Sequence, residues 1–227
     1  PAVPGPDDHR IAAFIAERVP DGATLQIGIG AIPNAVLSAL GDHEHLGLHT
    51  ELIGDGVIDL VETGAVTGAR KLRRRNKHVA TFCLGTQRLY DWLDDNDGVE
   101  MLGVEWVNNP MIIGEQPSFV SINATTEIDL MGQCASETIA GRYWSSSGGQ
   151  SDFARGAMYS EGGQAFVVLH SQTRKGRSRI RSQLTPGSVV TTLKNTVDHV
   201  VTEHGLVELR GKSLGERARL LISIAHP

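Results

Sequence analysis

One carboxylate in this sequence stands where a nucleophile would be useful, in the segment Leu48-His-Thr-Glu-Leu-Ile-Gly-Asp-Gly56. Glu51 lies at its centre, between a glycine turn that begins at Gly28 and a second one at Gly148-Gly149. Peptide N–H groups in glycine turns can stabilise an oxyanion, and a carboxylate held between them can attack a carbonyl carbon. On spacing alone, Glu51 also fits an ordinary residue at the end of a strand.

The first glycine turn, Gly28-Ile-Gly-Ala-Ile-Pro33, follows a buried-strand pattern over 23–29 and precedes a helix pattern over 33–40. Such a strand–turn–helix unit directs free backbone N–H groups at a bound anion. Pro33 and Asn34 stand where a dinucleotide fingerprint would carry its third glycine, which disfavours NAD or FAD. A structural turn and a backbone site for an anion or an acyl oxygen both remain open.

Other catalytic patterns are not present in the sequence. There is no Gly-x-Ser-x-Gly, so a hydrolase serine nucleophile is not supported. Cys83 and Cys134 lie in apolar contexts and fit reduced core residues. His43, His45 and His49 are close in sequence, but the segment around Gly41 and Gly47 fits a polar loop between a helix and a strand better than a metal site. We therefore expect no metal.

The composition is that of a globular protein. The 227 residues include 40% hydrophobic and 21% charged residues, with a net charge of −5, which argues against nucleic-acid binding. No apolar run reaches the roughly 20 residues that a membrane span needs, and no signal peptide opens the chain. We expect a cytoplasmic protein without membrane contact. The basic runs at 70–77 and 174–181 are typical of solvated surface, with phosphate contact as the alternative.

Alternating short strands and helices predict one α/β domain over 1–227, with a mostly parallel or mixed open sheet and helices on both faces. The expected strands cover 23–29, 46–52, 79–84, 99–104, 119–124, 127–131, 165–170, 188–193 and 199–202. The expected helices cover 8–19, 33–40, 57–62, 87–93 and 152–158, and a Ser213–Glu216 capping box opens a last one through Ile224. Glu51 then falls near the carboxyl end of a strand, where α/β sheets bind ligands.

Several motifs together resemble one known family. They are Gly28-Ile-Gly-Ala-Ile-Pro-Asn-Ala-Val, His49-Thr-Glu-Leu-Ile-Gly-Asp-Gly, Asp129-Leu-Met-Gly-Gln, Gly148-Gly-Gln-Ser-Asp-Phe, Val201-Thr-Glu-His-Gly and Ile224-Ala-His-Pro. In this order, over 23–227, they resemble the C-terminal domain of the acetyl-CoA hydrolase/transferase family, nearest to 4-hydroxybutyrate and butyrate CoA-transferases. One departure is Trp144-Ser-Ser-Ser, where relatives often carry another glycine, so this loop is expected to be stiffer.

The resemblance implies roles for individual residues. Glu51 matches the nucleophile, and Asn108 and Glu203 match residues that support the active site. Lys175 is a weaker match to a contact with a CoA phosphate. The turn that lines the thioester and CoA side comprises Gly28, Ile29, Gly30, Ala31 and Ile32, and the oxyanion-hole amides are those of Ile29 and of Gly148 or Gly149.

The implied reaction transfers CoA between an acyl-CoA and a short carboxylic acid through a glutamyl-CoA thioester on Glu51. CoA and acyl-CoA are then substrates, with no permanently bound cofactor. Members of the family are about twice this length, so the expected partner is an N-terminal domain of similar fold in the same protein. The resemblance also implies a homo-oligomer. Two alternatives remain open: an acyl-CoA hydrolase, and a non-catalytic CoA-binding half. The incomplete glycine fingerprint disfavours a third, a nucleotide-binding α/β domain.

Overall fold

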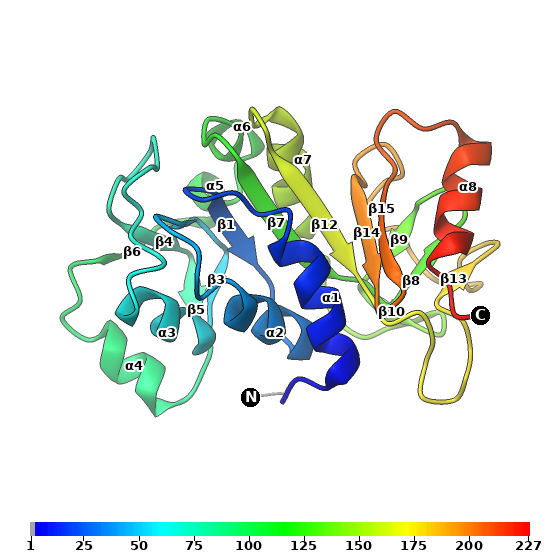
Figure 1. Cartoon of the computed structure of the whole chain (residues 1–227), viewed down its shortest axis with the longest axis horizontal. Coiled ribbons are helices and arrows are strands. Elements are labelled where there is room, and N and C mark those ends of the chain that lie inside the picture. Colours follow the sequence, from blue (N-terminus) through cyan, green and yellow to red (C-terminus); the bar gives the residue numbers. More distant parts are fainter. Residues whose placement is uncertain (1–2) are drawn as a thin grey trace.

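The computed structural model describes residues 3–227 and is built around a six-stranded sheet (Figure 1). The strands are β1 (Thr24–Ile27), β2 (Gly47–Leu48), β7 (Phe119–Ala124), β12 (Gln164–Val168), β14 (His199–Thr202) and β15 (Gly205–Glu208). They pair in the order β15-β14-β12-β7-β1-β2, and all neighbours are parallel except the β14–β15 hairpin. The predicted mixed α/β sheet is therefore confirmed.

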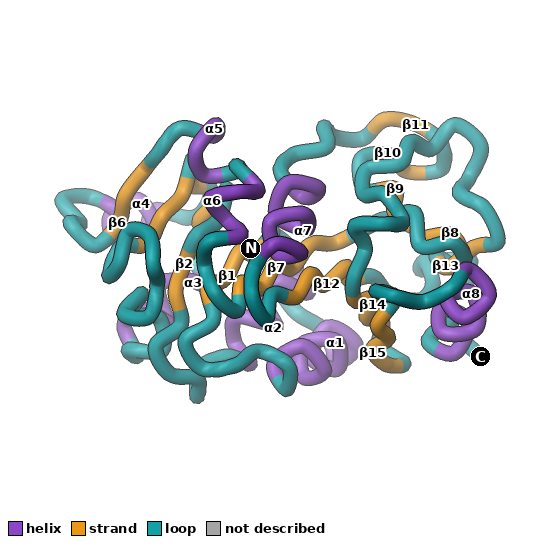
Figure 2. Tube along the Cα trace, turned by 90° about the horizontal axis from the view of Figure 1, so that it is seen from above, coloured by secondary structure: helices purple, strands orange, loops and turns teal. Residues whose placement is uncertain are grey.

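Helices cover both faces of this sheet (Figure 2). On one face lie α1 (Pro6–Ala16) and α2 (Ala31–Ala39), and on the other lie α6 (Pro110–Gly114) and α7 (Gln150–Tyr159). Side chains of β12 alternate between the two layers: Phe166 and Val168 belong to the core under α1 and α2, whereas Ala165 packs with Phe153 of α7. Burial on both faces explains why β12 is an almost continuous apolar run, whereas β1 and β7 also carry buried polar side chains, of which Ser121 donates to Gln26 at 2.7 Å.

The segment around Glu51 leaves the main sheet. The predicted strand over 46–52 is wrong, because the chain forms two short strands, β2 and β3 (Leu52–Ile53), with Glu51 in a bend between them. The N–H of Thr50 donates to Val79, and the N–H groups of Thr81 and Phe82 donate to the carbonyl of Glu51. Backbone groups of residues 79–82 thus form the hydrogen bonds of the Glu51 segment where the chain leaves the main sheet. The partners of this region are β4 (His78–Ala80), β5 (Phe82–Cys83) and β6 (Val99–Met101).

A smaller set of strands follows the main sheet at its β15 side (Figure 1). It contains β8 (Glu127–Asp129), β9 (Cys134–Ala135), β13 (Ile180–Arg181) and the hairpin of β10 (Thr138–Ile139) with β11 (Arg142–Tyr143). The predicted strand over 188–193 is wrong, because only Thr192 forms an isolated bridge there, to Cys134.

Three of the remaining helices agree closely with prediction: α3 (Gly56–Glu62), α4 (Gln87–Leu93) and α8 (Leu214–Ser223). The fourth, α5 (Val104–Val107), was not predicted, and it begins at the residue where the expected strand over 99–104 was to end. The capping box at the start of α8 is confirmed, since Ser213 and Glu216 exchange side-chain and backbone hydrogen bonds. None of the helices formed by residues 3–227 has the length and apolar character that a membrane span requires.

Candidate active site

The side chain of Glu51 is held by the start of helix α7. The backbone N–H of Gly149, the residue that caps α7, donates to Oε2 of Glu51 at 2.7 Å. An N-terminal helix amide is a favourable partner for a carboxylate, because the helix dipole places partial positive charge there. Glu51 is only half-buried, so its carboxylate stays open to a ligand while one oxygen is fixed.

Gly149 is required here for space rather than for backbone conformation. Its φ of −89° suits any residue, but a Cβ at this position would collide with Oε2 of Glu51 and Nδ2 of Asn108. Both side chains therefore lie against the same amide. Asn108 ends helix α5 and is 9% exposed, and its Oδ1 has no hydrogen-bond partner within residues 3–227. The structure thus brings together three residues that are distant in the sequence.

A pocket of about 250 Å³ opens in front of Glu51. Ile29 lines it, and the backbone N–H of Ile29 makes no hydrogen bond with any of the described residues. The N–H of Gly28 instead donates to Ile122 of β7 at 3.0 Å. Gly28 and Ile29 are the residues of the first turn that line this pocket, and of these two Ile29 has the free amide. The rest of the lining combines apolar side chains with polar ones. The apolar ones are Ile27, Leu52, Phe82 and Ala124, and the polar ones are Gln26, Asn123, Ser136, Ser145, Ser146, Ser147 and Gln150.

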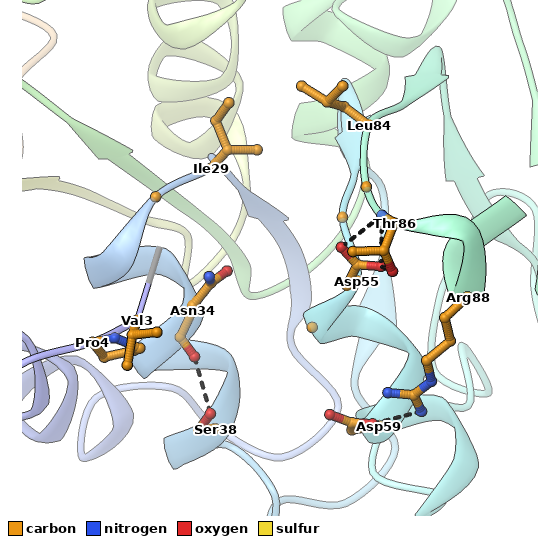
Figure 3. A pocket seen from close by; sticks show the side chains of 14 residues that line it. Val3, Pro4, Ile29, Asn34, Ser38, Asp55, Asp59, Leu84, Thr86 and Arg88 are labelled. Atoms are coloured by element: carbon orange, nitrogen blue, oxygen red, sulfur yellow. Dashed lines mark hydrogen bonds and ion pairs between the residues drawn. The ribbon is translucent and has the colours of Figure 1, made fainter. Parts of the chain in front are cut away.

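A larger groove of about 830 Å³ adjoins the first turn (Figure 3). Ile29 belongs to both cavities, and Leu84 and Val3 give the groove its apolar lining. Its charged groups already have partners, since Arg88 contacts Asp59 at 2.7 Å and Asp55 accepts from the hydroxyl of Thr86 at 2.7 Å. Of the first turn, Ile29 and Gly30 line this groove, whereas Ala31 and Ile32 belong to α2.

A second carboxylate lies close to Glu51. Asp152, in the first turn of α7, has its pKa raised by burial and by the negative charge of Glu51. It lines a cavity of about 430 Å³ together with Asn108. The motif Gly-Gly-Gln-Ser-Asp-Phe therefore supplies an acid to this region as well as the amide of Gly149.

Two predicted site residues, Glu203 and Lys175, line neither the pocket around Glu51 nor the two cavities beside it. Glu203, in the β14–β15 turn, accepts hydrogen bonds from the N–H of Ser171 at 2.8 Å and its hydroxyl at 2.5 Å. Burial raises the pKa of Glu203, but these hydrogen bonds outweigh it and the pKa lies below its usual range. Lys175 is exposed in the loop between β12 and β13. A role for either in binding CoA stays a prediction.

His49 has a place in the core that its grouping with His43 and His45 did not indicate. It is fully buried, and its Nε2 donates to the carbonyl of Val107 at 2.7 Å. Its ring stacks on Trp106 with centroids 5.3 Å apart. Burial, and then the charge of Lys71, lower the pKa of His49 to about 4. The sequence signal was its position inside the predicted strand over 46–52, of which residues 46–50 are all buried.

The sequence predicts no metal site at His43, His45 and His49. The structure brings together a different set of residues that could in principle bind a metal. Within residues 3–227, Asp198, His199 and Glu208 bring their ligand atoms within 4.8 Å of one another. The guanidinium of Arg210, however, donates to Oδ2 of Asp198 at 2.9 Å. This ion pair already compensates the buried carboxylate, so the cluster is read as structural.

Comparison with known proteins identifies the family of the chain. The sequence profile of the acetyl-CoA hydrolase/transferase C-terminal domain matches residues 85–227. The chain belongs to the acetyl-CoA hydrolase/transferase family. Within this family, it is 49% identical over 223 residues to the succinyl-CoA:cyclohexane-1-carboxylate CoA transferase of Geobacter metallireducens, covering 98% of the chain and 51% of the relative. It is 47% identical to the 4-hydroxybutyrate coenzyme A transferase of Clostridium kluyveri, covering 98% of the chain and 52% of that protein.

A solved structure shows the same fold. The crystal structure of RipA from Yersinia pestis superposes with a TM-score of 0.93 at 44% identity, covering 98% of the chain and 50% of RipA. The acetyl-CoA hydrolase/transferase chain described here therefore spans about half the length of the relatives it matches.

Proposed function

We propose that the chain carries the nucleophile of an acyl-CoA:carboxylate CoA-transferase, and that Glu51 is this nucleophile. The single observation that carries the proposal is the 2.7 Å hydrogen bond from the Gly149 amide to Oε2 of Glu51. It fixes a carboxylate at the mouth of a pocket, with the amide nitrogen of Asn108 against the same backbone group. The names of the relatives support the same reaction class.

The proposed reaction begins when a carboxylate oxygen of Glu51 attacks the carbonyl carbon of the acyl-CoA. The C–S bond breaks, CoA leaves as a thiolate, and an acyl-glutamyl anhydride remains. The thiolate then attacks the side-chain carbonyl carbon of Glu51, and the acyl group leaves as a carboxylate. This step leaves a glutamyl-CoA thioester. An acceptor carboxylate reverses both steps, so a new acyl-CoA forms and the carboxylate of Glu51 is restored.

The geometry indicates which donors serve which half of the chemistry. When the side-chain carbon of Glu51 becomes tetrahedral, its oxyanion is Oε2, which accepts from the Gly149 N–H at 2.7 Å and lies with Nδ2 of Asn108 around the Cβ position of Gly149. The oxyanion on the substrate's acyl carbon needs a separate donor, and the free amide of Ile29 lines the same pocket. Loss of one such donor typically costs about 2.7–4 kcal/mol of transition-state stabilisation.

The decisive experiment is mass spectrometry of the protein after incubation with an acyl-CoA and no acceptor acid. We expect a CoA adduct on the peptide that contains Glu51, and none in Glu51→Gln. An intact wild-type protein that never carries the adduct, even with the N-terminal half of a close relative added, would contradict the proposal.

Hydrolysis is the second candidate, because the family includes hydrolases by name and the pocket is lined by hydroxyl and amide groups. Both reactions share the intermediate and differ in whether an acid or water resolves it. Exchange of label between acetyl-CoA and acetate indicates transfer, whereas thiol release without an acid indicates hydrolysis. Binding of CoA without either activity would indicate a non-catalytic half.

We further propose a cytoplasmic location, because Cys83 and Cys134 are both unpaired and reduced cysteines are typical of that compartment.

A further inference from the structure

The imidazole of His49 contacts all three segments that form the site. It is two residues before Glu51, and its Nε2 bonds to the carbonyl of Val107 at 2.7 Å. Val107 is the residue before Asn108. On another side, the ring of Phe153 from helix α7 lies edge-on to His49 with centroids 6.3 Å apart.

The backbone of His49 is itself fixed. Its N–H donates to Leu25 of β1 at 3.0 Å, and the next N–H, of Thr50, donates to Val79 at 3.0 Å. The side chain therefore projects from a backbone segment that is hydrogen-bonded on both sides. One hydrogen bond, from Nε2 of His49, holds the Val107 carbonyl to this segment. Because Asn108 follows Val107 directly, the same hydrogen bond sets the distance between the Asn108 amide and the Glu51 carboxylate.

The hydrogen bond has a defined direction. A carbonyl oxygen can only accept, so the proton is on Nε2, and Nδ1 has no partner within residues 3–227. The nearby ammonium of Lys71 is used elsewhere, donating to the carbonyls of Leu48 at 2.7 Å and Lys77 at 2.8 Å. Aromatic rings surround the imidazole, with Trp106 stacked on it and Phe119 edge-on at 6.0 Å. Packing and one donor therefore determine its orientation.

We propose that His49 is a positioning residue for the transfer reaction and acts through Asn108, whose amide it holds against the carboxylate of Glu51. This inference rests on the proposed function of Glu51. An active-site displacement of about 1 Å can cost a rate factor of about 100, so a loosened Val107 carbonyl lowers turnover. It leaves the binding of CoA largely unchanged, since neither His49 nor Val107 lines the pocket in front of Glu51.

The test is a double-mutant cycle, carried out on the chain supplied with the N-terminal half of a close relative. His49→Phe keeps an aromatic ring but cannot donate to Val107, and Asn108→Ala removes the group that His49 positions. We expect His49→Phe to lower kcat by about tenfold to 100-fold with KM for acyl-CoA within about threefold. In the Asn108→Ala background, the same change should lower kcat by less than about twofold.

Two further variants separate positioning from general stability. His199→Phe is the matched control, because His199 is also buried beside an aromatic ring, 4.9 Å from Phe166, on strand β14. It should lower Tm without lowering kcat. His49→Gln, whose side-chain amide can donate to Val107, should restore kcat to within about threefold of wild type.

Independent effects of His49→Phe and Asn108→Ala on kcat would overturn the proposal, as would a loss of kcat in His199→Phe of similar size. If His49→Phe does not fold, His49→Gln and His49→Asn decide, because the asparagine amide is one methylene too short to reach Val107. Equal kcat values in these two variants would then reject it. Full activity in Glu51→Ala would instead reject the proposed function, which keeps the two failures distinguishable.

Discussion

The backbone amide of Gly149 donates to Oε2 of Glu51 at 2.7 Å across 98 positions of the chain. This contact joins the bend after strand β2 to the N-terminus of helix α7. It orients one carboxylate oxygen toward an oxyanion donor and leaves the other available for attack. The same contact defines which substitutions should affect chemistry rather than folding.

Shortening the nucleophile should abolish most activity while the fold is retained. Glu51→Asp withdraws the carboxylate by one methylene from the Gly149 amide, and near-attack geometry tolerates little such displacement. We expect kcat for CoA exchange to fall by at least about 100-fold. Thermal unfolding should change little, because Glu51 is only half-buried. A Glu51→Ala enzyme that exchanges CoA at the wild-type rate would contradict the assignment.

Filling the space at Gly149 should affect activity far more than stability. The β-branched side chain of Gly149→Val would displace the Glu51 carboxylate and the Asn108 amide, which a Cβ at this position meets directly. We expect a loss of activity of about 100-fold or more with a modest fall in Tm. Gly64→Ala is the control, since Gly64 has open space around its Cβ position and a φ of +83°, so it should lower Tm only. Parallel losses of activity and Tm in Gly149→Val would show a structural turn.

The N-terminal half of the relatives should increase turnover and not only affinity. Contacts to remote parts of CoA raise the rate at the thioester when they are realised in the transition state. We expect the 227-residue chain to fold, bind CoA weakly and transfer slowly by itself. Adding the N-terminal half of a close relative in trans should raise kcat. Full turnover by the chain alone would show that the added half is dispensable.

Mild acid should destabilise the fold through its buried imidazoles. The pKa of His49 is lowered from 6.5 to about 4, by burial and then by Lys71, so between these pH values the folded ring is neutral and the unfolded ring is charged. The unfolded state then binds more protons, and stability is lost as pH falls through this window. The pKa of His78 is lowered to about 4 in the same direction, by burial and then by Lys71.

The expected contribution of His49 is about 2 kcal/mol of unfolding free energy lost between pH 7 and pH 5. Urea unfolding at the two pH values measures it. In His49→Gln this loss should be smaller by about the same amount, with the His78 contribution left. An unchanged pH dependence in the variant would show that the buried imidazole does not titrate in this way.

The sequence by itself determined the layer architecture and several helices. The run 165–169 is apolar throughout because both faces of a central parallel strand are covered, and such a run can be read without a structure. Helix α4 and the capping box at Ser213 were also correct, since local hydrogen bonding and apolar spacing decide them. Glu51 was chosen as the candidate nucleophile from the order of motifs along the chain, which can be read without knowing the fold.

Tertiary structure decided which of those residues meet. Glu51 lies in a bend because Thr50 and Glu51 form backbone hydrogen bonds with Val79, Thr81 and Phe82, which are far away in sequence. The contact with Gly149 depends on how helix α7 packs on the sheet. His49 looked like one member of a polar histidine group, and only packing against Trp106 and Val107 places it in the core. Local sequence fixes backbone preferences over a few residues, whereas these contacts depend on how distant segments pack together.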